Sequence, residues 1–318
     1  MDDLFAVAEG ELHCHESIVL TDSRSYEDQV LLKDRRVLEN ILNRQQDSRH
    51  GIVNYFNTVQ SEIKPHMRKI VSDWMLEVCE EQQCHPEVFS LAINYMDRFL
   101  SQLSLQKHQF QLLASVCLFL ASKFKETNPL PAENLVIYTD NSISTHEITQ
   151  WELLVLDVLN WDLSAVTPYS ILDHLLRTLE FDPKFQVETV RRHSETFVAL
   201  AATEHVFCQT SPAVIAVACL ASALRGLNAQ GLDEMLAKLQ GLTGVQKNAI
   251  QECMDKVEIS ISLSMSGVSF QPTNSSPAVA PNQQSTHSST KIIPQQPGYY
   301  QHSTTPTDIM EISSTCVF

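Results

Sequence analysis

Three charged residues interrupt otherwise apolar helical rows in the first half of the chain. They are Arg68 in MRKIVSDWM, Asp97 in YMDRFL and Lys123 in LASKFKE. A charge in an apolar row is costly unless an opposite charge accompanies it. The chemistry open to these residues is therefore ion pairing. We expect Arg68 and Asp97 to form a buried pair that joins two helices, and loss of one partner to cost about 3–5 kcal/mol.

Lys123 and Glu152 are charged ends of apolar rows on two segments that could be neighbouring helices. The pattern admits two interpretations. The two side chains could form an internal salt bridge or extend past the rim of the core into water. Alternatively, they could point at the backbone of another protein, with the lysine donating to a carbonyl and the glutamate accepting from an amide. The residues alone leave both interpretations open.

A further apolar row consists of Met67, Ile70, Val71, Trp74 and Val78, at the spacing of one helix face. By pattern alone, this row predicts a helix face packed into a hydrophobic core. The interior of a protein is the usual place for such a face, because large apolar patches are rare on soluble monomers.

The sequence contains no common catalytic signature. The patterns GxGxxG, GxxxxGK[ST], HExxH and GxSxG are all missing. His13, Cys14 and His15 alternate in an acidic N-terminal segment that offers no clear further ligand, so we expect no metal site there. We expect no cofactor and no enzymatic activity.

Composition narrows the class of partner. The formal net charge is −16, which disfavours binding to a nucleic-acid backbone and suits a basic protein partner.

The eight cysteines form no CxxC pair and lie mostly in apolar helical patterns, as expected in a reducing compartment without disulfides. The chain begins with MDD and lacks the basic start of a signal peptide. The longest apolar run contains Pro212 and polar residues, so we expect a core helix and no membrane span.

Helices account for nearly all of the region that positions these residues. Pro65, Pro86 and Pro212 suit first helical turns, and Ser144 and Thr167 suit N-caps. We expect helices at 28–46, 66–82, 87–102, 107–125, 132–138, 145–160, 168–178, 184–206, 212–225, 231–239 and 245–263.

A faint internal repeat suggests two similar halves. Leu120-Ala121-Ser122 recurs as Leu220-Ala221-Ser222, each late in an unusually apolar segment. More than half of the residues from 266 onward are Ser, Thr, Asn, Gln or Pro, a composition typical of disorder. We expect a flexible acidic segment at 1–27, two helical domains at 28–163 and 164–265, and a disordered tail at 266–318.

Five segments, in this order, resemble the cyclin box, and most closely that of the D-type cyclins. They are MRKIVSDWMLEVCEEQ, NYMDRFLS, LASKFKET, IYTDNSI and ELLVLDVLNWDL, and the resemblance covers roughly residues 30–265. It implies an all-α fold of two tandem five-helix boxes, with central helices at 107–125 and 212–225. A preceding helix at 28–46 would pack on the first box.

The resemblance also implies a function. Lys123 and Glu152 would grip a cyclin-dependent kinase of the four/six class beside its αC helix, so that the chain would be the kinase's regulatory subunit. It would direct phosphorylation of retinoblastoma-family proteins and promote passage from G1 to S. A docking patch for RxL-type substrates and Kip-type inhibitors would leave the apolar row partly exposed. Its residues would be Met67, Ile70, Trp74, Glu77, Phe110 and Gln111. Phe110 and Val71 stand where many cyclins have Leu.

Two short motifs outside the boxes support the D type. Leu12, Cys14 and Glu16 fit LxCxE, which docks on the retinoblastoma pocket in D-type cyclins. In an extended strand all three side chains face the partner. Thr305, followed by proline and then Thr-Asp, resembles the D-type phosphodegron, which recruits a ubiquitin ligase once phosphorylated. Ser276-Pro277 shows that such pairs are common in tails.

Two rival classes remain. A transcription scaffold with cyclin-like repeats would need a basic DNA-facing surface and usually a zinc ribbon, which the net charge and the lack of CxxC disfavour. A viral cyclin mimic is a nearer rival, disfavoured by the phosphodegron-like tail. We expect the protein in the nucleus and cytoplasm.

Overall fold

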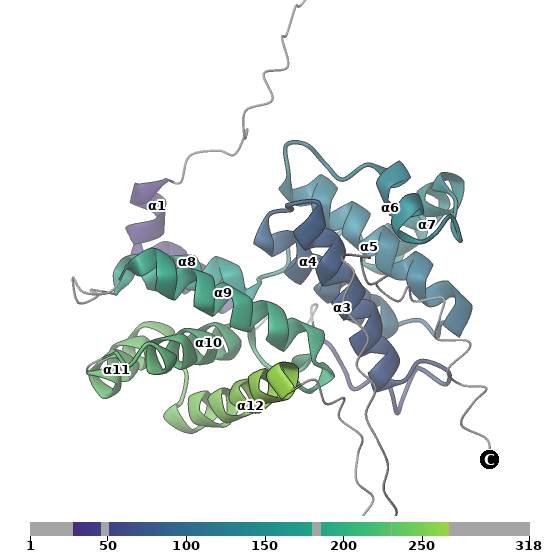
Figure 1. Cartoon of the computed structure of the whole chain (residues 1–318). Helices are drawn as coiled ribbons and strands as arrows, with labels where there is room; N and C mark the ends of the chain where they lie inside the picture. Colours follow the sequence, from purple (N-terminus) through teal and green to yellow (C-terminus); the bar gives the residue numbers. More distant parts are fainter. Residues whose placement is uncertain (1–27, 46–50, 180–185, 230, 267–318) are drawn as a thin grey trace, which may run out of the picture.

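The computed structural model describes residues 28–45, 51–179, 186–229 and 231–266. Every regular element in these ranges is a helix, and the helices form two groups (Figure 1). The predicted all-α fold of two helical boxes is confirmed. None of the described helices is both long enough and apolar enough to span a bilayer.

Each box contains five α-helices. In the first box a 3₁₀ turn, η2 (Lys107–Gln109), leads into the third helix, and in the second box the turn η3 (His205–Phe207) follows the second helix. The first box consists of α3 (Pro65–Glu81), α4 (Pro86–Leu100), α5 (Phe110–Lys125), α6 (Ala132–Tyr138) and α7 (Thr145–Val158). The second consists of α8 (Pro168–Thr178), α9 (Val187–Thr203), α10 (Pro212–Gly226), α11 (Leu232–Thr243) and α12 (Lys247–Ser266).

The chemistry of the helix starts explains where these elements begin. Proline occupies the first turn of α3, α4, α8 and α10, where a missing N–H costs nothing. Ser144 and Glu147 form a capping box at α7, and Thr167 caps α8 by accepting from the Ser170 amide. The predicted starts at Pro65, Pro86 and Pro212 are thereby confirmed.

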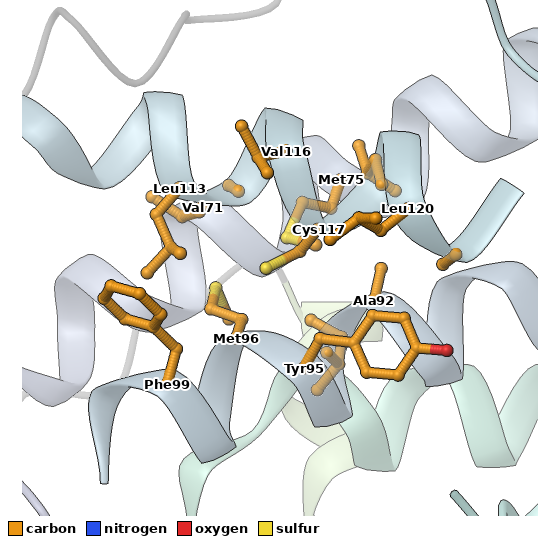
Figure 2. Close-up of a cluster of buried hydrophobic side chains, with 14 of the residues drawn as sticks. Val71, Met75, Ala92, Tyr95, Met96, Phe99, Leu113, Val116, Cys117 and Leu120 are labelled. Atoms are coloured by element: carbon orange, nitrogen blue, oxygen red, sulfur yellow. The ribbon is translucent and has the colours of Figure 1, made fainter. Parts of the chain in front are cut away.

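The two central helices are α5 and α10. α5 packs against α3, α4 and α7, and α10 packs against all four other helices of its box. Figure 2 shows Leu113 and Cys117 of α5 meeting Met96 and Phe99 of α4, with Met75 of α3 alongside. The repeated Leu-Ala-Ser triplets lie buried late in α5 and α10, as the repeat predicted.

The N-terminal segment departs from the expected single helix at 28–46. It forms α1 (Gln29–Lys33) and α2 (Arg35–Arg44), because the extended backbone of Asp34 ends one helix and its carboxylate caps the next. It also packs on the other box: Leu38 and Leu42 join the core of the second box, and the Leu32 carbonyl lies 3.0 Å from His174 Nδ1 of α8. The expectation that this segment packs on the first box is wrong.

Candidate functional site

Arg68 of α3 and Asp97 of α4 form a doubly hydrogen-bonded ion pair in the interior. Arg68 Nε lies 2.8 Å from Asp97 Oδ1 and Nη2 lies 2.7 Å from Oδ2, with the side chains only 1% and 2% exposed. The Tyr55 hydroxyl donates to Asp97 Oδ1 at 2.7 Å. Burial and the Asp97 carboxylate raise the pKa of Tyr55 well above its usual value, so it stays a donor. The predicted buried pair is confirmed.

The same arginine also joins the two boxes, which the sequence did not predict. Arg68 donates to the backbone carbonyls of Ala202 and Thr203 at 3.2 and 2.9 Å, at the end of α9. Its neighbour Lys69 pairs with Glu204 at 3.2 Å. Burial alone would lower the pKa of Arg68, but the contacts with Asp97 outweigh it and raise the pKa. The arginine is therefore a cationic junction of α3, α4 and α9.

Lys123 near the end of α5 pairs with Glu152 of α7, with Nζ 2.5 Å from Oε1. The lysine side chain is 45% exposed and the glutamate side chain 14%. The ammonium also lies 4.8 Å from the centre of the Phe119 ring. The predicted internal salt bridge is confirmed, and the lysine side chain also reaches the surface. Contact with the backbone of another protein stays a prediction.

Large apolar side chains lie exposed on the elements that carry this pair. Phe124 follows Lys123, Leu153 and Leu154 follow Glu152, and Trp161 lies just beyond α7. Leu153 is 62% exposed and Trp161 65%. Exposed apolar side chains gathered on adjoining elements mark a surface suited to a protein partner.

Comparison with known proteins decides the family. The family model described as cyclin, N-terminal domain, matches residues 15–164, and the one described as cyclin, C-terminal domain, matches residues 166–290. Human G1/S-specific cyclin-D3 is 43% identical over 257 residues, covering 80% of this chain and 87% of the relative. This chain belongs to the cyclin family.

The similarity of this cyclin to D-type members is confirmed by further relatives. G1/S-specific cyclin-D2 of Gallus gallus is 42% identical, covering 80% of this chain and 89% of the relative. G1/S-specific cyclin-D1 of Danio rerio is 45% identical, covering 79% and 86%. A solved viral cyclin from herpesvirus saimiri matches with a TM-score of 0.61 at 22% identity, covering 72% of this chain and 100% of its own. That likeness shows the fold alone.

The expected docking patch of the cyclin is largely covered. Met67, Trp74 and Phe110 are only 5%, 4% and 3% exposed, and Gln111 is also buried. The end of α6 and the turn after it contact two of these residues: Trp74 Nε1 donates to the Tyr138 carbonyl at 3.3 Å, and Ser142 Oγ donates to Gln111 Oε1 at 3.2 Å. The expectation of a partly exposed row is wrong for these four residues. Half-buried Ile70 and exposed Glu77 are the two patch residues that reach the surface.

Glu87 in the first turn of α4 is a second junction between the boxes of the cyclin. Its carboxylate pairs with Lys125 of α5 and accepts from Thr167 and Ser170 at 2.9 and 2.7 Å, at the start of α8. Burial alone would raise the pKa of Glu87, but the ammonium and the two hydroxyls outweigh it and lower the pKa. The sequence signal was an acid after Pro86, which indicates a helix start and says nothing of α8.

The remaining predicted residues fall elsewhere. Leu12, Cys14, Glu16 and Thr305 lie outside the residues that the structure describes. Within the described ranges, no three His, Cys, Asp or Glu side chains are grouped to hold a metal. A cavity of about 380 Å³ lies between the boxes, and Arg68 and Asp97 contribute to its lining.

Proposed function

We propose that this cyclin is the activating regulatory subunit of a cyclin-dependent kinase of the four/six class and acts at the G1/S transition. The names of its relatives, G1/S-specific cyclins D1, D2 and D3, support the stage of the cell cycle. The observation that carries the proposal is the Lys123–Glu152 pair, whose lysine side chain is nearly half exposed on helices that also expose apolar side chains, α5 and α7.

The mechanism is a shift of the kinase's conformational population. A protein kinase is active when its αC glutamate pairs with the β3 lysine and its activation loop is open. A rigid surface that binds only this αC-in state raises its population according to the differential affinity. Lys123 would donate to a backbone carbonyl of the kinase and Glu152 would accept from an amide, while Leu153 and Trp161 provide apolar contact area.

The test is capture of the kinase by the Lys123→Glu variant. We expect the wild-type cyclin to co-purify with a cyclin-dependent kinase from proliferating cells, and the variant to lose the kinase while its helical circular dichroism is unchanged. Lys256→Glu, which reverses an exposed lysine on α12 of the other box, is the matched control and should retain the kinase. Unchanged co-purification of Lys123→Glu would refute the assignment.

A second proposed partner is a retinoblastoma-family protein, which would be the substrate that the complex phosphorylates. Leu12, Cys14 and Glu16 would dock on its pocket as an extended strand with alternate side chains facing the partner. We expect Cys14→Gly to weaken binding to the retinoblastoma pocket without changing kinase capture. If the wild type and the Cys14→Gly variant bind the retinoblastoma pocket with equal affinity in a titration, this role is contradicted.

The tail carries a proposed control of protein lifetime. Phosphorylation of Thr305 would add about two negative charges to a segment of few charges, which suits an arginine-rich reader on a ubiquitin ligase. We expect Thr305→Ala to lengthen the half-life after synthesis is blocked, with Ser276→Ala as the matched control at the Ser276-Pro277 pair of the same tail. A half-life equal to that of the wild type would count against this phosphodegron.

Inhibitors and location complete the proposal. Docking of Kip-type inhibitors would use Ile70 and Glu77, with movement of the turn after α6 to admit side chains to Trp74. The protein would act in the nucleus and cytoplasm.

A further inference from the structure

The end of α3 brings two thiols together. Gln83 adopts a left-handed backbone with φ 53°, its amide donates to the Glu80 carbonyl at 3.1 Å, and the Cys84 amide donates to the Cys79 carbonyl at 2.9 Å. These bonds form a Schellman motif, in which the third-last helical residue and the second residue past the cap touch each other. In this helix those two residues are Cys79 and Cys84.

The same motif ends other helices of this chain with different side chains. In α10 the Ala229 amide donates to the Leu224 carbonyl at 3.0 Å, and in α7 the Trp161 amide donates to the Leu156 carbonyl at 2.8 Å. Packing of the helix end therefore needs no sulfur. Two cysteines at this place add a chemical property that the fold itself does not require.

The two thiols differ in exposure and in acidity. Cys79 is buried and Cys84 is half-buried. The neighbouring Cys84 sulfur and burial raise the pKa of Cys79, with smaller contributions from the carboxylates of Glu126 and Glu80. The neighbouring Cys79 thiol lowers the pKa of Cys84, against the opposing effects of burial and Glu126. Cys84 is the thiol that solvent can reach and that ionises first, which favours it as the nucleophile.

We propose that Cys79 and Cys84 are an oxidative modification site, at which a peroxide converts the two thiols into an intrachain disulfide across the end of α3. The site stands on the Schellman geometry, which brings the two cysteines together at the end of α3, and on the accessibility of Cys84. The proposal is independent of kinase binding.

The reaction has two balanced steps. The Cys84 thiolate attacks one oxygen of hydrogen peroxide: an S–O bond forms, the O–O bond breaks, and the hydroxide that leaves takes up the proton that the Cys84 thiol released, giving water. The Cys79 sulfur then attacks the sulfenic sulfur of Cys84; the S–S bond forms, the S–O bond breaks, and the released hydroxide takes the Cys79 proton as water. Two thiols lose two electrons, and one peroxide is reduced to two waters.

Peptide mapping of the full-length chain tests the site. Trypsin releases Ile70–Arg98, which contains both cysteines and no internal lysine or arginine. After brief treatment with hydrogen peroxide and alkylation, we expect this peptide to be two hydrogen atoms lighter and to carry no alkyl group. Cys208 is the internal control, because it is also half-buried and burial raises its pKa to about 11. We expect the pair to react faster than Cys208 by about tenfold or more.

Two variants separate the steps. Cys79→Ser should stop at the sulfenic acid of Cys84, which dimedone traps, and Cys84→Ser should leave Cys79 reduced. In urea, where the Schellman motif is lost, the pair should oxidise no faster than Cys208. The proposal is overturned if the peptide stays a dithiol while Cys208 oxidises. It is also overturned if the pair oxidises faster than Cys208 by the same factor in the urea-unfolded chain as in the folded chain.

Discussion

The two ion pairs of the first box have the same charges and different surroundings. Arg68–Asp97 is enclosed by Tyr55 and by two carbonyls of α9, whereas in Lys123–Glu152 the lysine side chain is nearly half exposed. A buried pair that loses one partner leaves an uncompensated charge in the interior, but an exposed pair contributes little to stability. The first pair therefore serves the fold, and the second is free to serve binding.

The difference reflects where each pair lies along its helices. Arg68 and Asp97 lie where α3 and α4 meet α9 of the second box, so the carbonyls that complete the arginine's hydrogen bonds come from another part of the chain. Lys123 lies in the last turn of α5, where a cation is favoured by the helix dipole and solvent can reach it. Similar charges in similar rows thus acquire different surroundings from the elements packed around them.

Breaking the buried pair should have the largest effect. We expect Arg68→Met to lower the free energy of unfolding by about 3–5 kcal/mol, because the Asp97 carboxylate is left buried without its cation and keeps the hydrogen bond from the Tyr55 hydroxyl. Urea denaturation followed by circular dichroism measures this change. Since the boxes meet at Arg68, the transition should also lose cooperativity between them.

The control for that prediction is the double variant Arg68→Met/Asp97→Leu. Removing both charges should cost less than the sum of the two single changes, with a coupling energy of about 0.5–3 kcal/mol. A cost below about 1 kcal/mol for Arg68→Met alone would show that the buried pair does not stabilise the fold as argued.

Exchanging the exposed charges should separate stability from binding. The variant Lys123→Glu/Glu152→Lys keeps an ion pair between α5 and α7, so we expect its free energy of unfolding to lie within about 1 kcal/mol of the wild-type value. Kinase affinity should fall by about a hundredfold or more, because the donor and acceptor now face the wrong backbone groups. Kinase titration by calorimetry measures the loss, and recovery of affinity in the exchanged variant would contradict a directional contact.

Several of these features could be predicted from the sequence because each has a local cause. A charge in an apolar row demands a partner, which predicted Arg68 with Asp97. Proline and cap residues predicted most helix starts. Apolar spacing alone predicted a buried row at Trp74, and the structure supports that interpretation over the exposure implied by family resemblance.

The features that could not be predicted depend on residues distant in the chain or on backbone groups, which every residue carries. The carbonyls of Ala202 and Thr203 have no side-chain signature, so nothing in the sequence assigned them to Arg68. Asp34 carried a cap signal, but its position inside an apolar period concealed the break between α1 and α2. Placement of α2 on the second box depends on tertiary packing of Leu38 and Leu42.

An intermediate case sharpens the comparison: Glu87 is less enclosed than Asp97 and more enclosed than Lys123, and it too joins the boxes. The fold lowers the pKa of Glu87 below its usual value of 4.5. The ionised carboxylate therefore stabilises the fold fully at a pH above the pKa of the unfolded chain, and this stabilisation is lost as the pH falls through the pKa of the folded chain. We expect Glu87→Gln to cost about 1–3 kcal/mol at pH 7, from lost charge-assisted hydrogen bonds. Measurement of the free energy of unfolding at a series of pH values should show the difference between the variant and the wild type shrinking as the pH falls below 4.5.

The control is Glu252→Gln, at an exposed position on α12, which should leave the free energy of unfolding nearly unchanged at any pH. If the loss of stability in Glu87→Gln stays the same in acid, packing rather than charge holds this junction.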